Sequence, residues 1–199
     1  MAFINLVEPL RTRADIAKMK RILQTRSARD YALFVLAINT GFRIGDLLAL
    51  TVGDVLAGAG ARLRIAPRVM VREQKTHKKR IAILNAPARK ALKQYLSTRA
   101  RRFPEDPLFI SRNRDKSGSY RAISRAQAWR RLSDAARACG IVSFGTHSMR
   151  KTFGYFHYKA GQPLEEIQKI LNHSSPAVTL CYIGITQEKL EQSYNDIEL

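Results

Sequence analysis

Apolar residues recur at helical spacing along most of the chain, with polar residues between them. A first helix is predicted to begin at Asp15, a residue type that caps helix N-termini, and to continue through residues 16–24. Residues 29–41 are apolar around most of a helix, which predicts a buried helix that ends at Gly41. Thr146 is predicted to cap a later helix. The remaining helical patterns cover residues 44–50 as one short turn, and residues 86–100, 124–140, 146–161, 163–173, 176–182 and 186–194.

The pattern changes in the middle of the chain, where short apolar or alternating runs replace the helical spacing. The runs at 63–66, 68–73 and 80–84 predict a three-stranded antiparallel sheet, with residues 75–79 at a hairpin tip. Residues 108–110 predict one more short strand between two loops, the second of which covers 112–120. The expected fold is mainly α with a small three-stranded antiparallel β-sheet, an α+β class, in a single domain.

The predicted helix 124–140 has an apolar stripe and a polar stripe on opposite faces. The polar stripe fits either a solvated face or a helix that lies against DNA. The apolar stripe consists of Ala128, Trp129, Leu132, Ala135, Ala136 and Cys139, and the polar stripe of Gln127, Arg130, Asp134 and Arg137.

Charge narrows the class of partner. The chain has 35 Lys and Arg against 16 Asp and Glu, a formal net charge of +19. A protein with a core and this excess usually binds a polyanion, and non-specific RNA packing is the alternative. Basic residues concentrate in 111–151, whereas 186–199 is acidic. The candidate DNA-binding residues are Arg112, Arg114, Lys116, Arg121, Arg125, Arg130 and Lys151.

The chain shows no sign of a membrane or secretory segment. No run of 18 or more residues is apolar, and the N-terminus lacks a basic start followed by an apolar block. Cys139 and Cys181 form no CxxC pair and are predicted to be small core residues in a reducing compartment. A cytoplasmic protein without a membrane partner is therefore expected.

Six polar residues stand in apolar or turn contexts. Each one has a structural explanation when taken singly. Arg43 can pair with Asp46 three positions on, and Lys75 suits a charged hairpin tip. The others suit a helix start, a helix end or a core tyrosine. Together they suit chemistry on a phosphodiester. The six are Arg43, Lys75, His147, Arg150, His173 and Tyr182.

The chemistry of phosphoryl transfer explains why these residue types would be combined. Arginines are always charged and bind phosphate oxygens in a bidentate manner, so they suit the extra negative charge of a phosphodiester under attack. A tyrosine with a free pKa of about 10 needs help to act as a nucleophile, and lysine or histidine can protonate a departing hydroxyl. No HExxH, phosphate-binding glycine loop, zinc spacing or carboxylate cluster occurs. A covalent mechanism without a metal or other cofactor is therefore expected.

The order of these residues resembles the tyrosine recombinase (phage integrase) family. Its pattern is an arginine, a β-hairpin lysine, His-x-x-Arg, a histidine or tryptophan, and then tyrosine. Here Tyr182 lies nine positions after His173, and His173 lies 23 positions after Arg150. The match covers nearly the whole chain, from 40–55 through 73–84 and 146–161 to 171–185.

The resemblance implies a role for each residue. Arg43 and Arg150 resemble the two arginines that hold the scissile phosphate, and His173 resembles the residue that hydrogen-bonds it. The family cleaves DNA without ATP or metal, because the covalent link preserves the phosphodiester energy.

The remaining roles concern the nucleophile and the protons. Tyr182 resembles the nucleophile that forms a 3′-phosphotyrosyl link, Lys75 the acid that protonates the leaving 5′-hydroxyl, and His147 the acid/base histidine. Val178 and Leu180 are expected to anchor the segment that carries the tyrosine.

Three departures from the family pattern are modest. Met149 stands where leucine is usual, an apolar exchange of similar volume. Asn172 replaces a glycine, and asparagine also tolerates the left-handed conformation that a helix end can require. Lys151 stands where histidine is common. None of the three removes a catalytic group.

Length is the larger departure, because typical members carry a further N-terminal helical domain. The chain is expected to be a catalytic-domain-only member without a separate core-binding domain, similar to the fimbrial phase-variation recombinases; a cloned fragment is the alternative. Residues 186–199 are expected to dock on a neighbouring protomer of a homotetramer on DNA, through Leu190, Tyr194 and Ile197, with a monomer or weak oligomer away from DNA.

The sequence thus predicts a site-specific DNA recombinase of bacterial or mobile-element type, associated with the nucleoid. Two alternatives stay open. The first is a non-enzymatic architectural or regulatory DNA-binding protein on the same fold. The second is a relaxing enzyme similar to type IB topoisomerases, which shares the chemistry but not the recombination outcome.

Overall fold

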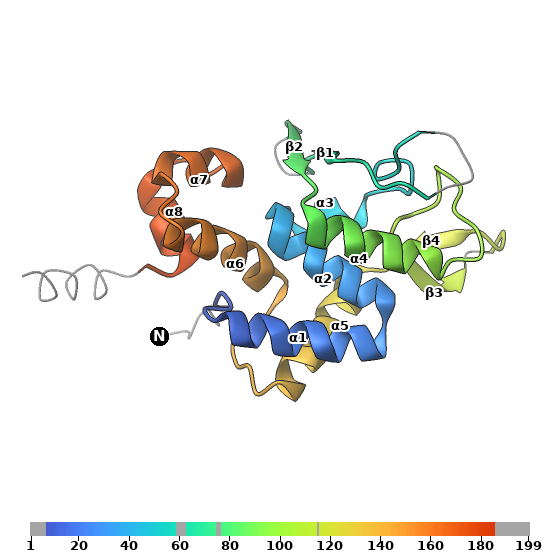
Figure 1. The fold of residues 1–199 in the computed structure, drawn as a ribbon, viewed down its shortest axis with the longest axis horizontal. Coiled ribbons are helices and arrows are strands. Elements are labelled where there is room, and N and C mark those ends of the chain that lie inside the picture. Colours follow the sequence, from blue (N-terminus) through green and yellow to red (C-terminus); the bar gives the residue numbers. More distant parts are fainter. Residues whose placement is uncertain (1–6, 59–62, 75–76, 115, 186–199) are drawn as a thin grey trace, which may run out of the picture.

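The computed structural model describes residues 7–58, 63–74, 77–114 and 116–185. The predicted α+β class is confirmed: helices dominate and the strands are short (Figure 1). The helix predicted over 186–194 lies outside the described residues. The elements are α1 (Arg13–Arg26), α2 (Ala28–Thr40), α3 (Ile44–Leu48), β1 (Arg68–Arg72), β2 (Lys79–Ile83), α4 (Ala86–Ser97), β3 (Ile110–Arg114), β4 (Tyr120–Ala122), α5 (Arg125–Ala138), α6 (Thr146–Lys159), α7 (Leu164–Leu171) and α8 (Pro176–Ile183).

Two predicted helix starts need correction. The α1 helix is capped by Thr12, whose side chain accepts a hydrogen bond from the backbone N–H of Asp15, so Asp15 lies inside the first turn instead of capping it. Thr146 is the first helical residue of α6, and Gly145 is its N-cap. The predicted end of α2 at Gly41 is confirmed, because this glycine adopts the left-handed conformation with φ 60°.

Helix α2 is the centre of the larger core. It contacts α1, α4, α5 and α6, and its residues Leu33, Phe34, Val35 and Leu36 are fully buried. A helix that is apolar on nearly all sides is stable only in such a central position. A second, smaller core joins α6, α7 and α8, which lie together at one end of the molecule (Figure 1). Helix α6 therefore connects the two cores.

The predicted three-stranded sheet is wrong, because β1 pairs only with β2 among the described residues. This pair is antiparallel, with Met70 opposite Ile81. The segment 63–66 instead forms an isolated bridge between Ile65 and Leu56. Only Pro67 separates this segment from β1, and a hairpin needs a loop of at least about two residues, so the chain continues onward instead of folding back.

A second antiparallel pair, β3 with β4, occupies both ends of the segment expected to be a loop at 112–120. The strand predicted at 108–110 begins only at Ile110. Leu108 and Phe109 are buried before it, whereas residues 112–114 are exposed. Because these strand residues are polar and solvated, they give no hydrophobic alternation from which the strand could have been recognised.

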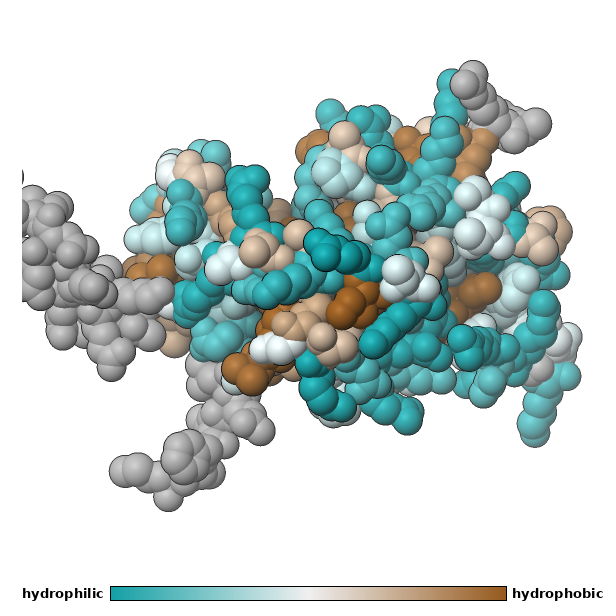
Figure 2. Space-filling model, turned by 60° about the horizontal axis from the view of Figure 1, so that its bottom comes forward, coloured by the Kyte–Doolittle hydropathy of each residue, from teal (hydrophilic) through white to brown (hydrophobic). Residues whose placement is uncertain are grey.

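Helix α5 buries most of its predicted apolar stripe, including Ala128, Leu132 and Ala135, but Trp129 is half exposed. Both cysteines are free, but the prediction that both are core residues is wrong for Cys181, which is exposed. Cys139 is partly buried. Figure 2 shows hydrophilic residues over most of the face on which α1 and α5 lie, with smaller apolar patches between them. In the described part of the chain, no helix has the length and apolar character needed to cross a membrane.

Candidate active site

The structure brings five of the six predicted catalytic residues together, where the ends of α2 and α7 meet α6 and α8. Some of these residues contact one another directly, and the others are linked through shared neighbours such as Glu73. The five are Arg43, His147, Arg150, His173 and Tyr182. The sixth, the hairpin lysine, lies outside the described residues.

Arg150 is held in place by two helix ends. It is 2% exposed, and its guanidinium donates to the carbonyl oxygen of Gly41 at 2.6 Å and to that of Leu171. Gly41 cannot be replaced without strain: its φ is 60°, and a Cβ there would lie 2.6 Å from Phe153. The turn after α2 and the last turn of α7 therefore aim Arg150 together.

Arg43 precedes α3 as its N-cap residue. Its Nη1 lies 2.6 Å from Oε1 of Glu73, a buried carboxylate that follows β1. Among the described residues Arg43 pairs with Glu73 and not with Asp46, whose Oδ1 accepts the backbone N–H of Gln74 at 3.0 Å. Arg43 is thus tied to the β1–β2 hairpin instead of to its own helix.

Tyr182 lies on α8 with its hydroxyl 3.3 Å from Nδ1 of His147. The ring of His173 meets the tyrosine ring edge-on, with 4.7 Å between the ring centres. Burial raises the pKa of Tyr182, and the positive charges of Arg150 and Arg43 oppose that rise. The phenol is therefore protonated at neutral pH and has a nitrogen acceptor within reach.

Both histidines are neutral at pH 7. Burial, followed by the charges of Arg150 and Arg43, lowers the pKa of His147 below its usual 6.5. Burial and the same two arginines lower the pKa of His173 to about 4. A neutral imidazole has one nitrogen free to accept a hydrogen bond or a proton. The site can therefore take up the phenolic proton.

The helix that carries Tyr182 is anchored differently from the prediction. Thr179 and Ile183 are buried, whereas Val178 is 45% exposed and is not an anchor. The second predicted anchor, Leu180, is partly buried. Thr179 also connects to the preceding loop, because its hydroxyl lies 3.2 Å from Nδ1 of His173. The predicted left-handed conformation of Asn172 is confirmed, with φ 50°.

Lys151 lies inside this site. It is 7% exposed, and its Nζ lies 5.5 Å from the centre of the Tyr182 ring. The other described candidates for DNA binding are exposed side chains of β3, β4, the turn between them and α5: Arg112, Arg114, Lys116, Arg121, Arg125 and Arg130.

Sequence reasoning missed two residues of the site, Glu73 and Arg80. Arg80 donates to the carbonyl oxygens of Thr40 and Gly41 and packs over the ring of Phe42. Burial, with a smaller effect of the neighbouring Arg150, lowers its pKa to about 10. Glu73 could have been noticed in the sequence, because it is a lone acidic residue between two basic segments. Nothing in the sequence distinguished Arg80 from its basic neighbours.

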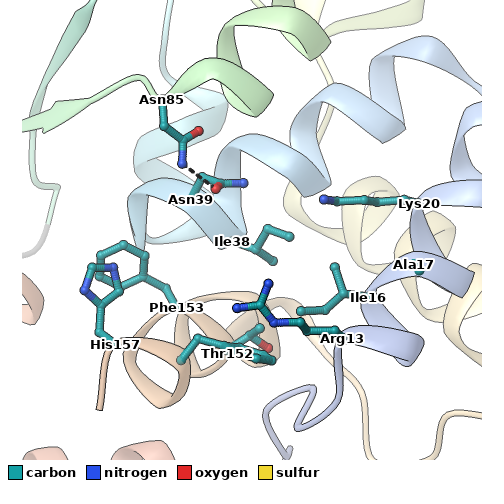
Figure 3. Close-up of a pocket in the computed structure, with 11 residues that line it drawn as sticks. Arg13, Ile16, Ala17, Lys20, Ile38, Asn39, Asn85, Thr152, Phe153 and His157 are labelled. Carbon is teal, nitrogen blue, oxygen red and sulfur yellow. Dashed lines mark hydrogen bonds between the residues drawn. The ribbon is translucent and has the colours of Figure 1, made fainter. Parts of the chain in front are cut away.

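A cavity of about 380 Å³ lies between α1, α2 and α6, apart from these residues. Figure 3 shows Arg13 and Lys20 of α1 on one side of it and His157 on the other, with a hydrogen bond from Asn85 to Asn39. None of the predicted catalytic residues that the structure describes lines it. In the same described segments, no group of three or more His, Cys, Asp or Glu is arranged to hold a metal ion.

Sequence comparisons point to one family. The family model described as the phage integrase family matches residues 12–189. The probable integrase/recombinase YoeC of Bacillus subtilis is 38% identical over 192 residues, which cover 96% of this chain and 97% of that protein. The tyrosine recombinase XerC of Corynebacterium glutamicum is 28% identical over 170 residues, which cover 84% of this chain and 50% of that protein. The chain thus spans nearly all of YoeC and half of XerC.

Solved structures share the fold. The crystal structure of XerA recombinase superposes with a TM-score of 0.73 at 24% identity, covering 95% of this chain and 63% of that one. The XerH recombinase bound to a palindromic difH substrate, in a post-cleavage complex, gives a TM-score of 0.68 at 20% identity, covering 96% of this chain and 53% of that one.

Proposed function

The chain belongs to the phage integrase family, as the resemblance predicted, and on that premise we propose that it is a site-specific DNA recombinase that cleaves and rejoins DNA through a 3′-phosphotyrosyl intermediate. The observation that carries the proposal is the position of the Tyr182 hydroxyl, 3.3 Å from a neutral His147. Arg43 and Arg150 contribute positive charge at the same hydroxyl.

Cleavage begins when the hydroxyl oxygen of Tyr182 attacks the scissile phosphorus. The phenolic proton passes to His147, the bond from the tyrosine oxygen to phosphorus forms, and the bond from phosphorus to the 5′ oxygen breaks. Lys75 of the hairpin gives a proton to that leaving oxygen. Rejoining runs the same steps in reverse, with a 5′-hydroxyl as the attacking group.

The two arginines stabilise the charge that develops on the non-bridging oxygens. Arg150 is held by two carbonyl oxygens and Arg43 by a carboxylate, so neither has to reorganise when the phosphate arrives. Preorganised donors of this kind each contribute about 3 kcal/mol to transition-state stabilisation. His173 supplies a further hydrogen bond to the phosphate.

The proposed mechanism uses neither ATP nor a metal ion, because the phosphotyrosyl bond stores the energy needed for rejoining. The proposed partner is double-stranded DNA, bound by the exposed arginines of β3, β4 and α5. Residues 186–199, which lie outside the described residues, are proposed to dock on a neighbouring protomer in a homotetramer on DNA. Their deletion should weaken assembly on DNA, and unchanged assembly would rule this contact out.

Covalent capture from a random pool tests the proposed activity and identifies the DNA target in one experiment. The protein is incubated in EDTA with nicked duplexes of random sequence, and DNA that stays linked to protein on a denaturing gel is recovered and sequenced. A nick beside the cleavage point traps the intermediate, because the short leaving strand diffuses away. We expect enrichment of one sequence.

The matched control is Tyr182→Phe, which removes one oxygen and keeps the ring. It should bind the enriched duplex and form no adduct. If no adduct is recovered, but the unaltered protein selects one sequence from the same pool by non-covalent binding, the result would instead favour a non-enzymatic DNA-binding protein.

A further inference from the structure

Glu73 is a buried carboxylate at the base of the β1–β2 hairpin, and only 1% of it is exposed. Its two oxygens face three separate segments. Oε1 lies 2.6 Å from Nη1 of Arg43 and 3.8 Å from Nη1 of Arg80. Oε2 accepts a hydrogen bond of 2.9 Å from Nδ2 of Asn172. One side chain therefore joins the start of α3, strand β2 and the C-terminal cap of α7.

The backbone of the same residue closes the hairpin. The N–H of Glu73 donates to the carbonyl oxygen of Lys78 at 3.0 Å, and its carbonyl oxygen accepts from the N–H of His77 at 2.8 Å. The next residue, Gln74, is fixed by the carboxylate of Asp46. The described residues on either side of 75–76, Gln74 and His77, are thus each held by a hydrogen bond.

The segments joined by Glu73 contain or adjoin three of the predicted catalytic residues. Arg43 touches it directly, Lys75 follows two residues later, and His173 follows Asn172. We infer that Glu73 is a positioning residue for strand transfer: its carboxylate fixes Arg43 and the hairpin against the loop after α7. The inference rests on the proposed function, since it concerns the geometry of that site.

Electrostatics explain why a carboxylate is needed here. Arg43, Arg80 and Arg150 lie close enough to repel one another, and each guanidinium is at least partly removed from water. Like charges in a partly buried site disfavour their own approach. A buried negative charge among them offsets that repulsion, and it also fixes the direction in which Arg43 donates. Glu73 itself is too buried to touch DNA.

The competing explanation is that Glu73 is a structural ion pair and nothing more. Asp106 offers a matched control, because it is also a buried carboxylate between two arginines. Its Oδ2 lies 3.1 Å from Nη2 of Arg99, and its Oδ1 lies 3.5 Å from Nη2 of Arg101. Among the described residues, the Asp106 side chain forms no hydrogen bond or ion pair with a predicted catalytic residue. Glu73→Gln and Asp106→Asn each remove one buried negative charge and keep side-chain size.

The first measurement is the rate of covalent adduct formation by the full chain at saturating concentrations of the nicked duplex recovered by capture. Glu73→Gln should slow it by more than about tenfold, because displacements near 1 Å have large effects on reaction geometry, while the dissociation constant for the duplex stays unchanged. Glu73→Asp should recover part of the rate, and Asp106→Asn should react like wild type. Wild-type rate in Glu73→Gln, or equal slowing in Asp106→Asn, would overturn the inference.

The second measurement does not depend on activity, so it separates this inference from the proposed function. Amide hydrogen exchange should accelerate in Glu73→Gln both at 77–83 and at 171–175, and in Asp106→Asn at neither. If wild type forms no adduct, the proposed function fails, yet exchange still decides whether Glu73 joins the two segments. Unchanged protection in both segments contradicts the inference.

A variant that breaks one contact alone covers the case in which Glu73→Gln does not fold. Asn172→Gly removes the amide that donates to Glu73, and glycine accepts the left-handed conformation at this position. It should loosen 171–175, leave the hairpin protected and slow adduct formation. Wild-type exchange and rate in this variant would also overturn the inference.

Discussion

The pKa values of three side chains at the candidate site differ from those of the same groups in water, and burial is the largest cause of each shift. His147, His173 and Tyr182 are each driven toward the neutral form, because burial disfavours charge. The nearby arginines add to this effect on the histidines and oppose it on the tyrosine. A neutral imidazole beside a protonated phenol is the pairing that proton transfer from tyrosine requires.

The lowered pKa of His173 predicts a loss of stability in acid. In the unfolded chain His173 takes up a proton near pH 6.5, whereas in the folded chain it does so only near pH 4. The contribution of neutral His173 to folding stability is therefore complete above about pH 6.5 and is lost as the pH falls toward 4. His173→Gln lacks this contribution. Its melting temperature should therefore fall less than that of wild type between about pH 7.5 and pH 5.

The control for this prediction is His77→Asn, which changes an exposed histidine of the hairpin. Asparagine suits this position, because it tolerates the left-handed backbone that His77 adopts with φ 57°. The fall in melting temperature of this variant between the two pH values should match that of wild type. Equal acid sensitivity of wild type and His173→Gln would contradict the lowered pKa of His173.

At the scale of elements, the site depends on how closely α8 packs on α6. Gly154 of α6 makes this possible: a Cβ there would lie 2.6 Å from Cγ2 of Ile183 and 3.0 Å from Cδ1 of Leu171. The absence of a side chain lets α7 and α8 lie against α6, and thereby sets the distance from Tyr182 to His147. The proposed nucleophile, Tyr182, is therefore positioned by a packing contact of the next residue, Ile183.

Gly154→Ala should push α7 and α8 away from α6. Overpacking of this kind costs about 1–3 kcal/mol, so the melting temperature should fall, and adduct formation should slow more than DNA binding weakens. Lys159→Ala, an exposed change on the same helix, is the control and should affect neither quantity. Wild-type adduct formation by Gly154→Ala would show that the close packing is not needed.

Elements differed in how far the sequence could predict them. The end of α2 at Gly41 and the conformation of Asn172 were predictable, because local backbone preference decides them. The partner of residues 63–66 was not, since the pairing depends on a segment elsewhere in the chain. The candidate site shows the same division. Its proposed catalytic side chains were predicted from their order along the chain, whereas the contact between Arg43 and Glu73 joins residues far apart and has no local pattern.

At the scale of the whole molecule, the buried and the exposed positive charges have different proposed roles. The buried arginines serve the candidate site, while much of the net charge of +19 lies on exposed side chains. The exposed arginines of β3, β4 and α5 form one such group, and Arg125 links it to the hairpin through a hydrogen bond to Gln74. DNA held along this group would therefore be held beside the hairpin that carries Lys75.

Binding to DNA should weaken steeply with salt, because each neutralised phosphate releases counterions. Replacing Arg112, Arg114 and Arg121 together by glutamine should lower the slope of log affinity against log salt by about 0.9 for each lost contact. The matched control changes three exposed arginines of α1 in the same way: Arg13, Arg21 and Arg26. Equal slopes for the two triple variants would contradict the proposed DNA-binding surface.

The most direct test of the central claim is to identify the residue that becomes linked to DNA. The adduct formed in EDTA is digested with protease and nuclease, and the modified peptide is sequenced by mass spectrometry. We expect a single linkage, a nucleotide 3′-phosphate on Tyr182. A linkage at any other residue, or none on a duplex that the protein binds specifically, would contradict the proposed role of this tyrosine.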